Sequence, residues 1–286
     1  MKQHELSEQL VLITGASSGM GAATAIEAAR RGAHVALVGR GEEKLRQVQE
    51  SISAFGGLAH AYMSDLTNAD QVEALRGRVE KDLGSPYFLL NNAGTGRWAY
   101  LDDTSYDEID QMIEAPLRSS LYITRAFLPG MLRRNSGAIG NVSSIAAFLP
   151  WSSSTTYTAV RWALRGFHEA LRADLKETNL SVTLAATAAV QTEYFEKNHS
   201  PIPVTPSWIP LLQPDQFAKA FIDALVQRKE LLILPRGIKM LEMLHHVLPA
   251  FVDSAMDKSA GQPRPGRARR DPSRGSGQAV GHSPRA

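Results

Sequence analysis

The stretch "QLVLITGASSGMGAATAIEAARRGA", residues 9–33, decides the fold. A short apolar run leads into the glycine-rich turn "TGASSGMG", residues 14–21, and a segment with helical spacing follows until Gly32. Glycines in such a turn let backbone N–H groups approach a phosphate, and the helix N-terminus favours negative charge. A turn of this kind between a buried strand and a helix therefore predicts a dinucleotide site.

The same alternation of strand and helix continues along the chain. Further apolar strands are "HVALVGR" (34–40), "LAHAYMSD" (58–65), "PYFLLNNAG" (86–94) and "GAIGNVSS" (137–144), with helical stretches between them. Repeated βα units predict a parallel sheet with helices on both faces, and continuous apolar strands fit burial on both sides. We therefore predict an α/β fold, a Rossmann-type doubly wound parallel sheet, as a single domain over residues 1–256.

The region from about residue 190 to 215 is less regular than the rest. Residues 191–215 read "QTEYFEKNHSPIPVTPSWIPLLQPD". The prolines and aromatic residues of this segment favour a lid or pocket wall over a core element. A helix near 214–227, a strand at 230–235 and an amphipathic helix near 237–256 complete the predicted domain.

Composition excludes several kinds of site. The chain has no cysteine, which excludes disulfides, thiolate metal sites and cysteine nucleophiles. Its eight histidines show no metal-ligand spacing, so no metal site is expected. The N-terminal "MKQHELSEQL" contains no apolar signal region, and no apolar run is long enough to span a membrane. We therefore expect a soluble, cytoplasmic protein.

The net charge of +2 conceals an uneven distribution. Residues 257–286 contain seven Lys/Arg against two Asp/Glu, together with nine Gly or Pro, whereas the rest of the chain carries a net charge of −3. This composition predicts a disordered basic tail outside the fold. The alternative is a tail that binds nucleic acid or an anionic membrane. The body has no basic stripe interleaved with aromatics, so neither partner is expected for it.

The end of the second predicted strand indicates which dinucleotide is bound. Sites that prefer NAD usually place an acidic residue there, where it bonds the ribose 2′-hydroxyl. This chain has Gly39-Arg40 instead. A guanidinium pairs with a 2′-phosphate in a bidentate manner, so Arg40 predicts that NADP(H) is preferred, with NAD(H) possible. The alternative is that Arg40 only lies on the surface.

Four motifs that are widely spaced along the chain occur in a characteristic order. They are the turn at 14–21, Asp65-Leu66, "NNAG" at 91–94, and "NVSS" at 141–144 followed by Tyr157. Over roughly residues 8–235 this set resembles the short-chain dehydrogenase/reductase family.

The resemblance implies roles for individual residues. Tyr157 would donate a proton to a substrate carbonyl oxygen while the nicotinamide delivers hydride, and Ser144 would hold that oxygen. The residue four positions after the tyrosine, Arg161, would bind the nicotinamide ribose and activate Tyr157. The cofactor-binding residues implied in the same way are Gly15, Ser17, Ser18, Gly19, Met20, Gly21, Arg40, Asp65, Leu66, Asn92, Ala93, Gly94, Tyr157, Arg161, Val190 and Thr192.

Three positions depart from the pattern of the family. Arg161 stands where the family has lysine, Pro116 where it has asparagine, and Thr187-Ala188 where it has Pro-Gly. Arg161 and Tyr157 share a helix face in "TTYTAVRWALRGF", so the cation would still stabilise a tyrosinate. It does not readily pass protons, because arginine has no accessible neutral form.

Pro116 lies inside a helical stretch predicted over residues 105–133, which Ser105 and Glu108 begin with a capping box. A proline removes one backbone hydrogen bond and kinks a helix. In the family the asparagine lies at a helix kink and its carbonyl holds a water, and Pro116 would keep both the kink and a carbonyl. The alternative is that Pro116 marks lost catalysis.

Aromatic residues gather in the segments that are expected to surround the pocket. They are Trp98, Phe148, Trp151, Tyr194, Phe195 and Trp208. We expect an apolar, fairly bulky carbonyl or alcohol as the substrate.

The sequence thus predicts an NADP(H)-dependent oxidoreductase that acts on a carbonyl or alcohol. One alternative is a sensor or pseudoenzyme that binds the dinucleotide without turnover, and another is imine or non-redox chemistry on the same scaffold. By resemblance the apolar positions of helices 105–133 and 155–178 predict a homodimer or homotetramer.

Overall fold

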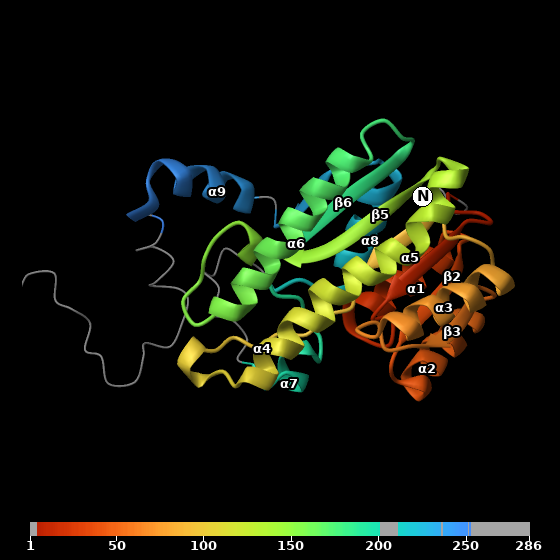
Figure 1. Ribbon diagram of the computed structural model, residues 1–286, viewed down its shortest axis with the longest axis horizontal. Helices are drawn as coiled ribbons and strands as arrows, with labels where there is room; N and C mark the ends of the chain where they lie inside the picture. Colours follow the sequence, from red (N-terminus) through yellow and green to blue (C-terminus); the bar gives the residue numbers. More distant parts are fainter. Residues whose placement is uncertain (1–4, 201–210, 236, 251, 253–286) are drawn as a thin grey trace, which may run out of the picture.

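The computed structural model describes residues 5–200, 211–235, 237–250 and 252. A parallel seven-stranded sheet forms its centre, with the strand order β3-β2-β1-β4-β5-β6-β7 (Figure 1). The strands are β1 (Leu10–Thr14), β2 (His34–Gly39), β3 (Leu58–Met63), β4 (Phe88–Asn91), β5 (Gly137–Ser144), β6 (Leu180–Thr187) and β7 (Leu231–Leu234). The predicted Rossmann-type α/β fold is confirmed.

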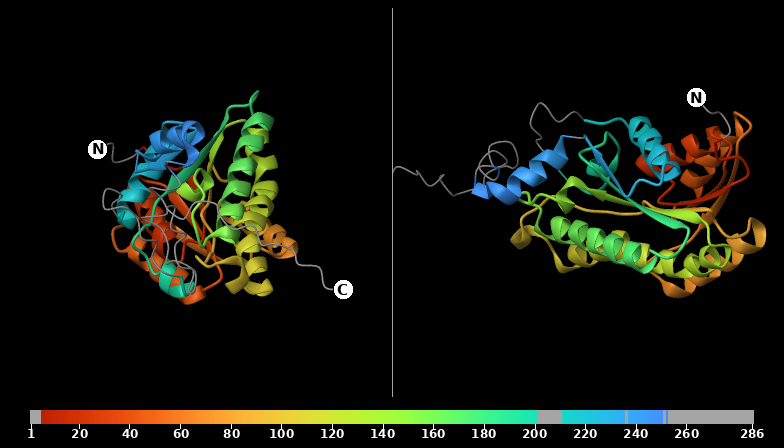
Figure 2. Two further views of the ribbon diagram at one scale, coloured as in Figure 1. Left: turned by 90° about the vertical axis from the view of Figure 1, so that its left-hand side faces the viewer. Right: turned by 90° about the horizontal axis from the view of Figure 1, so that it is seen from above.

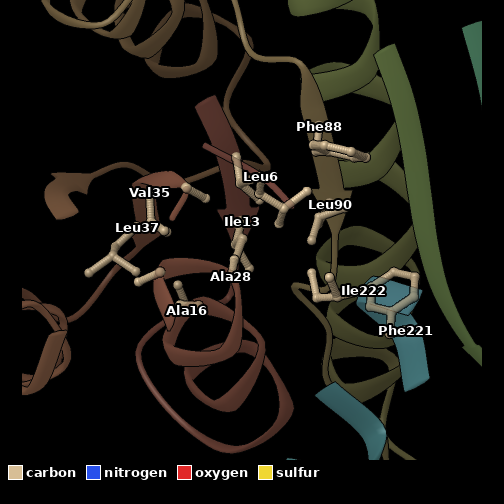
Figure 3. Close-up of a cluster of buried hydrophobic side chains, with 14 of the residues drawn as sticks. Leu6, Ile13, Ala16, Ala28, Val35, Leu37, Phe88, Leu90, Phe221 and Ile222 are labelled. Atoms are coloured by element: carbon tan, nitrogen blue, oxygen red, sulfur yellow. The ribbon is translucent and has the colours of Figure 1, made fainter. Parts of the chain in front are cut away.

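Helices cover both faces of this sheet (Figure 2). The α-helices described are α1 (Gly19–Arg30), α2 (Glu42–Ser53), α3 (Ala69–Asp82), α4 (Tyr106–Ile113), α5 (Ser119–Arg134), α6 (Thr155–Asp174), α7 (Tyr194–Lys197), α8 (Pro214–Val226) and α9 (Ile238–Val247). One apolar cluster joins α1, α2 and α8 to the sheet, as Figure 3 shows for Ile13, Ala28 and Phe221. A second cluster joins α3, α5 and α6 to the opposite face.

The central strands are apolar along their whole length because both of their faces are covered. Every residue of β1, β4 and β5 is buried. The direction of winding reverses between β1 and β4, which are neighbours in the sheet although two strands separate them in the chain. In open parallel sheets this reversal opens a crevice beyond the carboxyl ends of the strands, where ligands bind.

The helical stretch predicted over 105–133 is interrupted at Pro116, whereas its second proline, Pro129, lies within α5. The capping box is present: Ser105 Oγ accepts from the Glu108 N–H at 3.2 Å, and the Glu108 carboxylate accepts from the Ser105 N–H at 2.9 Å. Between α4 and α5 the backbone forms a π-helical turn, Glu114–Arg118, which contains Pro116. The proline thus widens one turn of the helix, as π-bulges at functional sites do.

Some sequence predictions fall on residues outside the described part of the chain. These are Trp208, residues 201–210 of the predicted lid, and the basic tail at 257–286. The C-terminal helix predicted over 237–256 is described as α9, which ends at Val247.

Candidate active site

The turn between β1 and α1 needs glycine at several positions. Gly15 and Gly19 have φ angles of +64° and +55°, a region that L side chains rarely adopt. A Cβ on Gly21 would lie 2.2 Å from the carbonyl oxygen of Gly15. The sequence therefore forms a turn of bare backbone, which a phosphate group can approach closely.

The N-terminus of α1 is left open toward this turn. Ser18 is its N-cap residue, but the Ser18 side chain makes no capping hydrogen bond, and the first turn contains no acidic residue. The first N–H groups of a helix have no partner within the helix and carry partial positive charge. The residues of this turn therefore fit the pyrophosphate of a dinucleotide.

Hydrogen bonds fix the loop after β4 against the glycine-rich turn. Asn92 Nδ2 donates to the carbonyl oxygens of Thr14 at 3.0 Å and Gly15 at 3.3 Å. Thr14 Oγ1 accepts from the backbone N–H groups of Asn92 at 2.9 Å and Ala93 at 3.0 Å. The "NNAG" motif thus connects the two strands at the point where the winding reverses.

A cavity of about 590 Å³ extends from this turn along the carboxyl ends of the strands. The predicted site residues that line it are Gly15, Ser17, Ser18, Gly19, Met20, Gly21, Arg40, Asp65, Leu66, Trp98, Asn92, Ala93, Gly94, Ser144, Trp151, Tyr157, Arg161, Val190, Thr192, Tyr194 and Phe195. The fold therefore brings together residues that are far apart in the sequence.

Phe148 is the predicted pocket residue that the structure places elsewhere. It is buried, does not line the cavity, and its ring centre lies 4.2 Å from the guanidinium carbon of Arg165. Phe148 follows the 3₁₀ turn Ile145–Ala147 and lies in an apolar cluster behind the cavity wall, which also contains Trp151. Phe148 is therefore a packing residue, and its proposed place in the substrate pocket is corrected.

Several lining residues were not found from the sequence. They include Gln111 and Ser119 beside the π-helical turn, and Lys197 and Asn198 at the end of α7. Gln111 and Ser119 lie within helices, where nothing in the local pattern distinguishes them. The pair formed by Lys197 and Ser18 joins segments 179 positions apart, without any motif at the lysine.

Arg40 and Asp65 lie at the end of the cavity formed by β2 and β3. Arg40 is exposed and follows β2. Asp65 Oδ1 accepts from the backbone N–H of Thr67 at 3.0 Å and from Thr67 Oγ1 at 2.8 Å. These two hydrogen bonds, with a smaller contribution from the charge of Arg40, hold the pKa of Asp65 below its usual range. Asp65 is thus a fixed acceptor, and the exposed Arg40 lies beside it at the same end of the cavity.

Tyr157 and Arg161 contact one another on α6, as their spacing predicts. Arg161 is only 7% exposed, and its guanidinium carbon lies 4.6 Å from the centre of the Tyr157 ring. Arg161 Nη2 also donates to the hydroxyl of Tyr194 at 3.4 Å. The guanidinium therefore lies between two phenols in the cavity wall.

The charge of Arg161 is unusual for a buried side chain. No carboxylate among the described residues forms a salt bridge with it. Burial lowers the pKa of the guanidinium, but Tyr157 and Tyr194 outweigh this effect, so the pKa lies above its ordinary value. Burial raises the pKa of Tyr194 in turn, which keeps its hydroxyl neutral. Arg161 is thus a permanent cation stabilised by aromatic faces and hydroxyls.

Pro116 lies close to this pair. A Cβ on Gly94 would be 3.3 Å from the Cβ of Pro116 and 3.8 Å from Nη2 of Arg161. The Pro116 carbonyl oxygen accepts from Ser120 Oγ at 2.6 Å. One of the two lone pairs of this carbonyl is therefore already used within the helix.

Ser144 ends β5 and begins the following 3₁₀ turn. Its Oγ accepts from the backbone N–H of Ala146 at 3.2 Å, which fixes the side chain at the cavity wall. The neighbouring Ser143 donates from Oγ to the Arg161 carbonyl oxygen at 3.4 Å and so connects β5 to α6. Ser144 remains able to donate its own proton to a ligand oxygen.

Aromatic rings line the cavity beside Tyr157. The Trp98 ring centre lies 5.8 Å from that of Tyr157 and 5.9 Å from that of Trp151. Three buried polar atoms on lining residues, Asn92 Oδ1, Trp151 Nε1 and Thr187 Oγ1, have no hydrogen-bond partner in the described part of the chain. The wall beside Tyr157 is thus aromatic, with a few polar atoms available to a ligand.

Comparison with known proteins agrees with this geometry. A family model described as short chain dehydrogenase matches residues 9–202. The 17-beta-hydroxysteroid dehydrogenase 13 of Rattus norvegicus is 29% identical over 260 residues, covering 90% of this chain and 85% of that protein. An oxidoreductase of Staphylococcus aureus (strain USA300) is 31% identical over 228 residues, covering 78% of this chain and 94% of that protein.

Solved structures show the same architecture. A metagenomic short-chain oxidoreductase in complex with NADP has a TM-score of 0.68 and 30% identity, over 80% of this chain and 98% of that chain. A short chain dehydrogenase/reductase from Burkholderia phymatum in complex with NAD has a TM-score of 0.78 and 23% identity, over 91% of this chain and 98% of that chain. The chain belongs to the short-chain dehydrogenase/reductase family, a family of NAD(P)-dependent oxidoreductases.

The described helices are too short or too polar to cross a membrane.

Proposed function

We propose that the protein is an NADP(H)-dependent carbonyl reductase or alcohol dehydrogenase acting on an apolar, bulky substrate. The observation that carries this proposal is the position of Tyr157, which lies in the cavity wall against a buried cation that no carboxylate of the described residues neutralises. A permanent positive charge beside a phenol stabilises the negative charge that develops when the phenol gives up its proton.

The residues that would hold the cofactor extend along the cavity. The open N-terminus of α1 would bind the pyrophosphate, and Arg40 the 2′-phosphate. Val190 and Thr192 would meet the carboxamide, and NADPH bound in this way would supply hydride.

The residues of this chain then provide binding and proton transfer. Ser144 donates a hydrogen bond to the carbonyl oxygen of the substrate, and Tyr157 transfers its proton to that oxygen in reduction or receives one in oxidation. Arg161 holds Tyr157 in position and stabilises the developing phenolate. Because arginine does not give up a proton, Tyr157 is reprotonated from solvent.

The substrate class follows from the aromatic wall. Trp98 lies next to Tyr157, and Trp151 lies next to Trp98, so that large apolar groups attached to the reacting carbonyl would pack against these rings. A small hydrophilic ketone would leave these rings in contact with water.

We also propose that the protein is a homodimer or homotetramer. Leu121 and Leu132 on α5 and Trp162 on α6 are between 39% and 46% exposed. Large apolar side chains on neighbouring helices are typical of a surface that a second copy covers. The mass of the protein in solution tests whether it forms such an oligomer.

A fluorescence titration with NADPH and NADH, followed by a panel of ketones, tests the proposal. We expect micromolar binding that is tighter for NADPH, with oxidation of NADPH in the presence of bulky apolar ketones. Tighter binding of NADH would contradict the role of Arg40 alone, whereas binding of neither would contradict the proposed function.

A second candidate function is dinucleotide binding without turnover. Arg161 in place of lysine and the use of the Pro116 carbonyl by Ser120 favour it, since both weaken a proton relay. This function predicts cofactor binding with no NADPH oxidation across the whole ketone panel.

A further inference from the structure

A short segment around α7 crosses the cofactor end of the cavity. Lys197 Nζ, at the end of α7, donates to Ser18 Oγ at 3.2 Å. Glu193, just before α7, lies 3.5 Å from Nζ of Lys44 on α2 and 2.5 Å from Nζ of Lys197. After α7, Asn198 accepts a hydrogen bond from Thr95. We call residues 193–198 the strap, because they connect the cavity walls on both sides.

The position of Lys197 is electrostatically unusual. Ser18 is the N-cap residue of α1, so the ammonium group lies at the positive end of the helix dipole. Cations near a helix N-terminus are disfavoured and anions are favoured. The first turn of α1 contains no acidic side chain to offset this charge. Two sources of positive charge therefore meet at one point of the cavity wall.

The partner of Lys197 in the present arrangement is weakly held. The Glu193 side chain is 60% exposed and lies on the same strap, four positions before the lysine. An exposed ion pair of this kind contributes little to stability. Lys197 can therefore leave Glu193 and pair with a more highly charged anion, such as a phosphate group, without a large energetic cost.

We propose that Lys197 is a phosphate ligand carried by the strap, which binds the pyrophosphate from the side opposite α1. This inference rests on the proposed function, because it assumes that a dinucleotide occupies the cavity. The backbone N–H groups of α1 and the ammonium of Lys197 then contact the same anion, as charge-assisted hydrogen bonds. Binding of the anion thereby draws the strap onto the cofactor.

This role differs from that of Arg40. Arg40 lies after β2, at the end of the cavity where a 2′-phosphate would lie, and so distinguishes NADPH from NADH. The pyrophosphate is common to both cofactors. Lys197 therefore sets affinity for both dinucleotides equally, whereas Arg40 sets the preference between them.

The test is a fluorescence titration of the full chain with NADPH and NADH, using Lys197→Met. We expect the Kd for both cofactors to rise by the same factor, about five- to tenfold at low salt. The difference in Kd between the variant and the unaltered protein should narrow at high salt. Lys197→Arg should restore most of the affinity, and Arg40→Gln should weaken NADPH alone. Lys81→Met, an exposed lysine of α3 that does not line the cavity, is the charge-matched control.

The variant Glu193→Gln distinguishes the effect of the Lys197 charge from the effect of the ion pairs that hold the strap. It breaks the Glu193–Lys197 ion pair, as Lys197→Met does, and also the Glu193–Lys44 ion pair, but it leaves the Lys197 cation free, so we expect affinity to be kept or raised. Equal loss in both variants, an effect of Lys197→Met on NADPH only, or no effect on either cofactor would each overturn the role of Lys197. Failure of the unaltered protein to bind either cofactor would instead contradict the proposed function.

Discussion

The guanidinium of Arg161 lies over the face of the Tyr157 ring, 4.6 Å from its centre, one turn further along α6. A lysine at this position would present a compact charge on a flexible stem, whereas the planar guanidinium stacks on the ring and also reaches the hydroxyl of Tyr194. The substitution thus changes how the cation contacts the phenol, while the positive charge beside it is kept.

Replacing Tyr157 by phenylalanine tests whether this phenol transfers a proton. Tyr157→Phe keeps the ring that Arg161 stacks on and removes only the hydroxyl, so the fold and cofactor affinity should be nearly unchanged. We expect kcat for ketone reduction to fall by about 10²- to 10⁴-fold, the usual contribution of a general acid. Steady-state kinetics with a bulky ketone measures it, and retention of most of the activity would contradict the mechanism.

Replacing Arg161 by methionine should affect activity and stability in opposite directions. Ketone reduction should fall about 10²-fold, because the charge that stabilises the developing phenolate is lost. The free energy of unfolding should stay the same or rise by about 1 kcal/mol, because a buried cation without a carboxylate partner in the described structure is removed.

Arg31→Met is the matched control for stability. Arg31 is similarly buried, at 9% exposure, but donates to Glu27 at 2.7 Å and to Asp223 at 2.6 Å. Its removal breaks these pairs and should lower the free energy of unfolding by about 2 kcal/mol. Chemical denaturation of both variants measures the difference, and equal destabilisation would show that Arg161 has a structural partner of similar strength.

Much of the fold is encoded in local patterns. The buried strands read as continuous apolar runs because helices cover both of their faces, and the capping box at Ser105 and Glu108 marks the start of α4. The glycine-rich turn can be predicted from the sequence because its backbone leaves no room for a side chain at Gly21. These features depend on neighbours in the sequence, which is why they can be predicted without the structure.

Other parts of the site depend on tertiary packing, so local sequence patterns do not predict them. An aromatic residue after β5 can face either the cavity or the core. Phe148 and Trp151 belong to the same apolar cluster, but only Trp151 also lines the cavity. Pro116 predicts a kink, but that the kink is a π-helical turn depends on how α4 and α5 pack. Lys197 reaches Ser18 only because α7 folds back over the turn.

His168 on α6 should make stability depend on pH. It is 1% exposed, and burial lowers its pKa from the ordinary value of 6.5 to about 4. The unfolded chain therefore binds a proton near pH 6.5 that the folded chain does not bind until about pH 4. The stabilisation is complete above pH 6.5 and is lost as the pH falls toward 4, by up to about 3 kcal/mol.

The variant His168→Leu separates this group from other acid effects. It removes the titrating ring, so the fall in the melting temperature between pH 7 and pH 4.5 should become shallower than in the unaltered protein. Thermal unfolding across this range measures it. If the melting temperatures of the two proteins fell equally with pH, protonation of His168 would not destabilise the folded state, and the prediction would be wrong.

Trp151 and Phe148 provide a matched pair for testing the substrate pocket. Both are large, buried aromatic residues in the same apolar cluster, but only Trp151 lines the cavity. Replacing either by leucine should destabilise the fold by about 1–3 kcal/mol, because a cavity forms in the core. Only Trp151→Leu should change the ratio of kcat/KM for a bulky ketone to that for a small one, by about five- to tenfold. Since the loss of stability is shared, a changed ratio in Trp151→Leu alone assigns the specificity to the wall beside Tyr157. An unchanged ratio would remove Trp151 from the substrate pocket, and a change in Phe148→Leu would show that core packing sets the shape of the pocket.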